Sequence, residues 1–160
     1  MAVRTRGGFG IFANVSDQPA LRIKRLHADA QVPGRGTAGA SGLDVYAYLP
    51  EGQLTLGPDP VRVATGVAIE FPQGLDVQVR PRSGLSLKGV GVAFGTIDCD
   101  YRGEVLVTMW TFGSTKEHVL HHGDRIAQLV VSALAVLPIV EVEELSSSDR
   151  GAGGHGSTGR

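Results

Sequence analysis

The 160-residue sequence lacks several features that would mark a specialised class of protein. It has one cysteine, Cys99, which excludes an internal disulfide and is typical of a reducing compartment. No apolar run approaches the ~20 residues of a membrane-spanning helix. The formal net charge is -1, so no overall field attracts nucleic acid or a membrane. We therefore expect an intracellular protein, in the cytoplasm or nucleus, with no nucleic-acid or membrane partner.

What the sequence does contain is short segments punctuated by 23 glycines and 8 prolines, which is typical of all-β domains. Apolar residues alternate in VRVATGVAIEF, LDVQVRP and EVLVTMW, as in strands with one buried face. The run IAQLVVSALAVLPIVEV is more continuous, which predicts a strand covered on both faces. Pro138 and the β-branched residues argue against a helix there.

The composition divides the chain into three parts. Residues 1–20 carry charge but no apolar segment of signal-peptide length, so we expect a poorly ordered N-terminal extension. Residues 21–145 hold the strand patterns and predict a single β-barrel or sandwich. After Leu145 the sequence turns to Ser, Gly and Asp, and residues 146–160 are expected to form a flexible tail.

Five stretches are richer in Gly, Asp, Arg and Ser than packing requires: AGASGLDVYA, RPRSGLSLKG, GTIDCDYRGEV, GDRIAQLVV and RGAGGHGSTGR. Each has a structural explanation when taken alone. The RSG after Pro81 suits a turn or a helix start, and the acidic residues beside Cys99 suit a hairpin tip. Gly123-Asp124 is a common hairpin turn. The tail spells G-x-G-x-x-G, but too few residues follow it to build the helix of a dinucleotide-binding turn.

Together, and in this order, the five stretches resemble the five motifs of the dUTPases, the deoxyuridine triphosphate nucleotidohydrolases. The resemblance covers residues 21–159, and its most specific parts are PRSGL, GTIDCDYRGE and the tail. It implies an all-β fold of the β-barrel or jelly-roll type, assembled as a homotrimer. It also implies cleavage of dUTP to dUMP and pyrophosphate with Mg²⁺, by a water molecule that attacks the α-phosphorus.

Such a hydrolysis needs a base that orients and deprotonates water, and a carboxylate is suitable. Asp98 and Asp100 have the same chemistry, and the residues alone do not choose between them. The resemblance assigns the base to Asp98. Asp44 matches the aspartate of the first motif, which the resemblance places in the outer shell of Mg²⁺. Magnesium binds mainly through substrate phosphates and water, so no dedicated protein cage is expected.

The remaining substrate-binding residues are also implied by the resemblance. Phosphates are expected to bind Arg82, Ser83 and Gly84, which offer a guanidinium fork, a hydroxyl and an approachable N–H, and also Gln128. Tyr101 is expected to pack against deoxyribose and to exclude a 2′-hydroxyl; the alternative is a core aromatic. Uracil is expected to lie against a hairpin that contains Val92, Gly95, Thr96 and Ile97. Val92 stands where the family often has Asn, and its backbone groups remain available to the base.

The tail matches the fifth motif, a strap that closes over bound nucleotide. Its candidate contacts are Arg150, His155, Gly156, Ser157 and Thr158. His155 replaces the usual Phe that stacks on uracil, but an imidazole ring can still stack on a base. Two other readings stay open. One is a non-catalytic regulatory or binding protein on the same fold, and the other is a dCTP-deaminase-like enzyme that would need an acid/base glutamate near the base, for which Glu104 is the nearest residue.

Overall fold

A computed structural model describes residues 19–149 together with residues 151 and 152. The described chain forms ten strands and one five-residue helix, in agreement with the predicted all-β class. None of the described residues belongs to a helix with the length and hydropathy of a membrane span. The strands and helix are β1 (Arg22–Arg25), β2 (Gly42–Tyr46), β3 (Gln53–Leu56), β4 (Val61–Glu70), β5 (Leu75–Arg80), α1 (Ser83–Leu87), β6 (Val90–Val92), β7 (Gly95–Ile97), β8 (Glu104–Thr111), β9 (His118–His121) and β10 (Arg125–Ala133).

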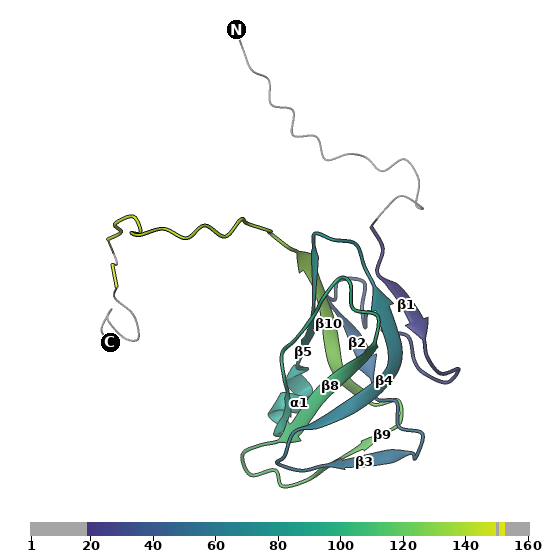
Figure 1. Ribbon diagram of the computed structural model, residues 1–160. Coiled ribbons are helices and arrows are strands. Elements are labelled where there is room, and N and C mark those ends of the chain that lie inside the picture. Colours follow the sequence, from purple (N-terminus) through teal and green to yellow (C-terminus); the bar gives the residue numbers. More distant parts are fainter. Residues whose placement is uncertain (1–18, 150, 153–160) are drawn as a thin grey trace.

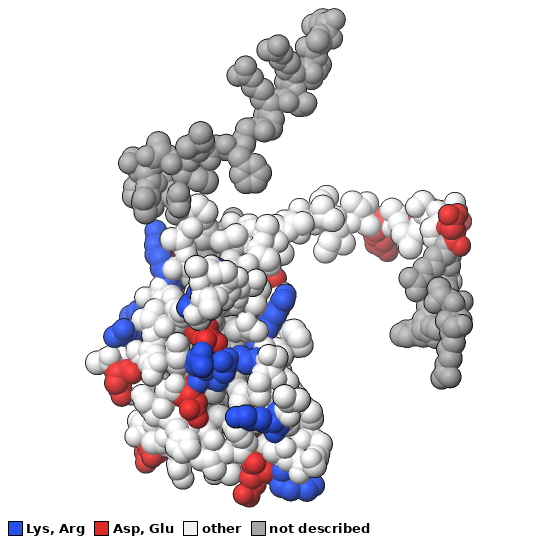
Figure 2. Space-filling view, turned by 180° about the vertical axis from the view of Figure 1, so that it is seen from behind, with Lys and Arg blue, Asp and Glu red and all other residues white. Residues whose placement is uncertain are grey.

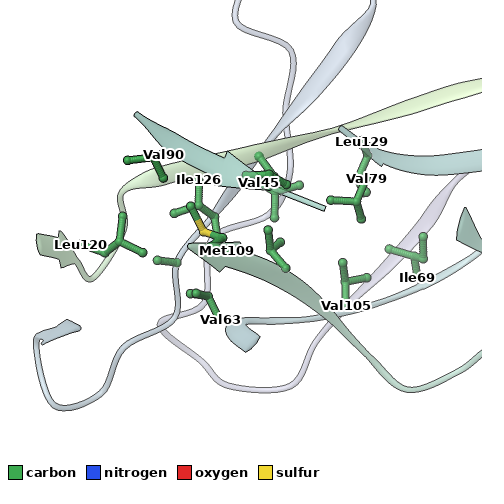
Figure 3. Packing of buried hydrophobic residues seen from close by; sticks show 14 of the residues in the cluster. Val45, Val63, Ile69, Val79, Val90, Val105, Met109, Leu120, Ile126 and Leu129 are labelled. Carbon is green, nitrogen blue, oxygen red and sulfur yellow. The ribbon is translucent and has the colours of Figure 1, made fainter. Parts of the chain in front are cut away.

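The strands form two four-stranded antiparallel sheets, ordered β1-β4-β8-β6 and β2-β10-β5-β7, and a two-stranded sheet β3-β9 (Figure 1). The hydrogen bonding is therefore not that of one continuous closed barrel. The two larger sheets bury one shared core, to which β4 and β8 contribute Val63, Val107 and Met109. Val45, Val79, Ile126 and Leu129 of the second sheet meet them there (Figure 3). The alternating residues of the three period-two segments supply much of this core, as predicted.

The two hairpins considered as structural explanations of single motifs are not formed, because the strands on either side of each turn belong to different sheets. Gly123 and Asp124 join β9 to β10. β9 pairs with β3, whereas β10 pairs with β2 and β5. The acidic turn around Cys99 joins β7 to β8, and these strands are likewise in separate sheets. Short connections here carry the chain from one sheet to the other. Turn composition predicts that the chain reverses, but not which strand it then pairs with.

The predicted strand after residue 126 is shorter than expected. β10 ends at Ala133, and the last backbone bond to the domain runs from the Leu134 N–H to the Gly74 carbonyl, at 2.9 Å. Residues 135–149, here called the arm, extend away from the sheets (Figure 1). Its apolar side chains are exposed, and Ile139 is fully exposed. The predicted strand covered on both faces holds only in part, because burial is complete no further than Leu129 and the end of β10, Ser132 and Ala133, is already exposed. The apolar side chains of the arm are left largely exposed.

Charged residues of both signs are interspersed on the surface, as the small net charge predicts. Figure 2 shows basic and acidic side chains mixed over one face of the domain, while the arm is largely neutral until its acidic far part. The surface therefore offers no broad field of one sign on that face. Any cationic site for phosphate must be built locally.

Candidate active site

A carboxylate between two arginines lies at the start of β10. Asp44 Oδ1 forms an ion pair with Arg82 Nε at 2.9 Å, and its Oδ2 accepts a hydrogen bond from Arg125 Nη1 at 3.2 Å. Arg82 Nη1 donates to the Arg125 carbonyl oxygen at 2.9 Å. The side chain of Asp44 is only 16% exposed. The sequence prediction placed Asp44 and Arg82 in one site, and the structure brings them into direct contact.

Strand register brings these residues together. β10 lies between β2 and β5, and Gln128 faces Asp44 on one side and Arg80 on the other. The Gln128 amide donates to the Pro81 carbonyl at 2.9 Å, next to Arg82. Gly42 has no room for a Cβ because the Gln128 side chain lies against it. Motifs from three separate segments therefore converge at one end of this sheet.

Helix α1 presents the other two predicted phosphate residues. Arg82 is its N-cap, with an extended backbone, and Ser83 and Gly84 form its first turn. Both residues are exposed, and a Cβ on Gly84 would meet no atom within 4 Å. N–H groups in a first turn have no partner within the helix, so they are available to an acceptor. The helix-start interpretation of RSG is confirmed, and it is compatible with phosphate binding.

A second part of the candidate site is a groove of about 220 Å³ between β7 and β8. Gly95, Thr96, Ile97, Asp98, Tyr101 and Glu104 line it, together with Val79, Val105 and Leu106. Tyr101 is 45% exposed, which rules out the alternative of a core aromatic. Its phenol donates to the Glu104 carbonyl at 3.0 Å, and its N–H donates to the Asp98 carbonyl at 3.0 Å. Asp98, the candidate general base, and Tyr101, the residue expected to contact deoxyribose, therefore belong to one hydrogen-bonded turn.

Asp98 also borders a larger hollow of about 620 Å³ on its other side. Asp76 and Asp100 line this hollow with apolar side chains that include Leu75 of β5, Leu134 after β10 and Val136 of the arm. Asp98 is exposed, as a base that must reach a substrate requires. Of the two candidate carboxylates, Asp98 lines both hollows and Asp100 lines only the larger one.

Val92 lies in β6 with its side chain in the core, and the predicted contact of its backbone with uracil stays a prediction. Its side chain is 5% exposed and belongs to the core, because β6 pairs with β8 at Val92 opposite Met109. β6 and β7 lie in different sheets, so they do not form a hairpin with each other. The N–H of Ala93 is already bonded to the Thr108 carbonyl, at 2.9 Å. Residues 95–97, which follow this loop, line the groove.

The two parts of the site lie at opposite ends of β5. Ile97 faces Val77 in the β5–β7 ladder, which puts Asp98 level with Asp76, whereas Arg82 follows the other end of the strand. Six extended residues from Asp76 to Arg82 span roughly 20 Å at about 3.3 Å per residue. A single phosphate group is too small to contact both Asp98 and Arg82 across that distance within one chain.

Arg125 is the residue of this site that the sequence analysis missed. It lies three residues before Gln128, and strict alternation would put the two side chains on opposite faces of the strand. A bulge between Arg125 and Ala127 changes the register, so that Arg125 faces Tyr46 and Gln128 faces Asp44. Tyr46 and Asp44 are two residues apart and share a face. The only signal in the sequence is the position of this arginine inside the GDRIAQ stretch.

The predicted tail contacts Arg150, His155, Gly156, Ser157 and Thr158 lie outside the described residues. Within the described ranges, no group of three or more His, Cys, Asp or Glu side chains is placed to hold a metal ion. Both oxygens of Asp44 already accept bonds from arginine, which does not suit a direct metal ligand. It does suit a carboxylate that meets a hydrated ion through water, and therefore the predicted outer-shell role.

The structure therefore combines an all-β fold with a cluster of two arginines around Asp44 and a separate groove lined by Asp98. A model of the dUTPase family matches residues 28–159. The deoxyuridine 5′-triphosphate nucleotidohydrolase of Caulobacter vibrioides is 47% identical over 147 residues, which cover 88% of this chain and 94% of that protein. The chain belongs to the dUTPase family.

Two solved structures have the same fold. A mutant dUTPase of Staphylococcus bacteriophage 80alpha, with dUpNHpp, matches with a TM-score of 0.76 and 25% identity over 88% of this chain and 99% of that one. A mutant dUTPase of phage phi11 of S. aureus, which reveals the coordination of a structural Mg(II) ion, matches with a TM-score of 0.69 and 22% identity. That match covers 78% of this chain and 97% of the phage chain.

Proposed function

We propose that this protein hydrolyses dUTP to dUMP and pyrophosphate, with water attacking the α-phosphorus. The observation that carries the proposal is the presence of both halves of the required chemistry on one fold. Arg82, held by Asp44, lies beside the exposed first turn of α1, and the exposed Asp98 lies in a groove with Tyr101. Membership of the dUTPase family supports the choice of reaction.

Asp98 acts as the general base. Its carboxylate takes a proton from the attacking water, and the new oxygen–phosphorus bond forms as the bond to the pyrophosphate oxygen breaks. Water is the only co-reactant, so dUTP and water give dUMP and pyrophosphate. A positioned base of this kind contributes about 10²–10⁴-fold in rate.

Tyr101 sets the sugar preference. Its ring forms part of the groove wall, and the bond from its phenol to the Glu104 carbonyl fixes it there. A ring fixed beside the sugar leaves no space for a 2′-hydroxyl, so UTP is rejected. Gly95, Thr96 and Ile97 line the same groove and provide backbone groups for uracil.

Phosphate binding falls to Arg82, Ser83, Gly84 and Gln128. A guanidinium, a hydroxyl and first-turn N–H groups neutralise the charge of the phosphates, and such positioning supplies most of the catalysis in phosphoryl transfer. Mg²⁺, when bound, neutralises phosphate charge; Asp44 would face it through water. The tail residues Arg150, His155, Gly156, Ser157 and Thr158 would complete the enclosure.

We infer that the active unit is a homotrimer whose sites are shared between copies. The separation of roughly 20 Å between Asp98 and Arg82 along β5 supports this, because a second copy must bring one of them to the other. The exposed apolar arm supports it independently, since a contiguous exposed apolar surface marks an interaction site. A closed ring of identical copies satisfies both requirements.

The test is to incubate the purified full chain with dUTP, UTP and dCTP in the presence of Mg²⁺, and to follow pyrophosphate and uracil nucleotides. The proposal expects pyrophosphate from dUTP and little from UTP. A deaminase would instead convert dCTP to dUTP without early pyrophosphate, and a binding protein would turn over none of the three. The structure disfavours a deaminase, because the Glu104 carboxylate already accepts the N–H groups of Thr65 and Gly66, at 3.2 and 2.7 Å.

A further inference from the structure

Arg125 has no part in the reaction described above, yet it completes a closed ring of contacts with two residues that do. Its side chain binds Oδ2 of Asp44, and its carbonyl oxygen accepts a bond from Arg82. Arg82 in turn binds Oδ1 of the same carboxylate. Each member of the ring therefore touches both of the others.

The partial burial of these three residues favours a role of their contacts in fixing side-chain orientations. Exposed fractions are 16% for the Asp44 side chain, 26% for Arg82 and 52% for Arg125. Exposed ion pairs rarely hold a fixed geometry, whereas charge-assisted bonds to a mostly buried carboxylate do so much better. Asp44 is clamped from both sides, and its orientation decides where Arg82 points.

The contacts also divide the guanidinium of Arg82 into two parts. Nε and Nη1 bond to Asp44 and to the Arg125 carbonyl. Within the described part of the chain, Nη2 makes no bond, so it is available to an external acceptor. An arginine with two nitrogens fixed loses less freedom when it binds phosphate than one that is free to rotate.

We propose that Arg125 is a positioning residue for the substrate phosphates, acting through Asp44 and Arg82 without touching the nucleotide. The inference rests on the proposed dUTP hydrolysis and adds a residue to it. Without the Arg125 side chain, the Asp44 carboxylate keeps only its ion pair with Arg82. Arg82 keeps its bond to the main-chain carbonyl of residue 125 but is held less tightly through Asp44, while the groove that holds base and sugar is unchanged.

The experiment compares two ligands that differ in their phosphates. Binding of dUMP and of a non-hydrolysable dUTP analogue is measured on the full chain with Mg²⁺, alongside steady-state kinetics with dUTP. Arg125→Ala is expected to weaken the analogue at least about tenfold, since small misplacements of a binding group have such effects. dUMP binding stays within about twofold, because the change concerns the phosphate contacts. Arg125→Lys, which keeps one donor for Asp44, restores most of the loss.

The link through Asp44 is tested in a double variant. If Arg125 acts through Asp44, then Arg125→Ala adds little to Asp44→Asn, because the two changes break the same ring. Additive losses would mean that Arg125 contacts substrate directly, and would overturn the proposal. Equal weakening of dUMP and the analogue, or no weakening of either, would overturn it as well.

The matched control is Arg22→Ala, which removes an exposed arginine bonded to Glu70 at 2.7 Å, away from the site. Binding of both ligands should be unchanged. Wild-type turnover of dUTP tests the proposed function separately, so failure of that function and failure of the Arg125 inference give different results.

Discussion

Gly103 lies directly against the phenol of Tyr101, so closely that a Cβ at residue 103 would overlap the Tyr101 hydroxyl and ring. The chain turns back between the two residues, which lets the phenol reach the Glu104 carbonyl. The glycine of Y-R-G-E is therefore a packing requirement of the tyrosine that forms the sugar wall.

Gly103→Ala is expected to push the Tyr101 ring out of place and to loosen sugar selection. The ratio of kcat/KM for UTP to that for dUTP should rise by about tenfold or more, as expected when a steric wall moves. Tyr101→Ala should raise the ratio at least as much. Tyr101→Phe keeps the ring and serves as the matched control with a smaller change. An unchanged ratio in both Gly103→Ala and Tyr101→Ala would refute the steric account.

Asp98→Asn should leave the fold and nucleotide binding intact while turnover falls at least ~100-fold, because an amide cannot accept the proton of water at neutral pH. Single-turnover measurements with dUTP separate this loss from any change in affinity. Asp100→Asn is the control, because Asp100 has the same chemistry but lines only the larger hollow. If Asp100→Asn caused the larger loss of the two, the base would have been assigned to the wrong residue.

A substitution at Thr65 would measure what a buried hydroxyl contributes to the stability of the core. Thr65 is the one break in the apolar alternation of VRVATGVAIEF, yet it is buried, and its hydroxyl donates to the Val105 carbonyl at 2.6 Å. The β4–β8 ladder is irregular between Ala64 and Ala68, and the hydroxyl supplies a bond where the ladder is interrupted. Thr65→Val should lower the free energy of unfolding by about 1–3 kcal/mol, since a buried carbonyl loses its partner.

The measurement is urea unfolding at fixed protein concentration, because an oligomer's stability depends on concentration. Thr55→Val, at an exposed position of β3, is the matched control and should stay within about 0.5 kcal/mol of the wild type. Equal effects at both positions would show that the Thr65 hydroxyl contributes nothing specific.

The sequence predicted strands and motifs better than it predicted how they pair. Alternation depends only on which face of a strand is buried, so Val63, Val77 and Val107 were placed correctly in the core. Sheet membership depends on contacts between distant segments, and the turns at Cys99 and Gly123 gave no information about it. Val92 was assigned to the uracil loop by its position in a motif, and that position did not indicate that its side chain packs in the core.

The arm and Arg125 show two further limits of sequence-based prediction. Apolar residues at 136–142 fit burial, but the pattern does not say whether the covering surface belongs to the same chain. Arg125 joins the phosphate cluster because a bulge shifts the register, and a bulge leaves no mark in the alternation of so short a stretch.

The last prediction tests whether Asp98 and Arg82 serve a site from different copies of the chain. Asp98→Asn and Arg82→Ala should each be inactive alone. If a site takes Asp98 from one copy and Arg82 from another, unfolding the two together and refolding an equal mixture should restore about a quarter of the sites, because random assortment pairs two intact residues that often. dUTP turnover of the mixture, with oligomer mass by sedimentation, provides the measurement.

Each variant refolded alone controls for residual activity, and mixing the folded proteins without unfolding controls for subunit exchange. A chain truncated after Asp149 can replace Arg82→Ala in the mixture. This version tests whether the tail of one copy serves the site of another. If both residues served a site in cis, every chain in the mixture would carry one defect and turnover would stay at the level of the single variants. A monomer by sedimentation would contradict the shared site directly, since roughly 20 Å of β5 would then separate the base from the phosphates it must act on.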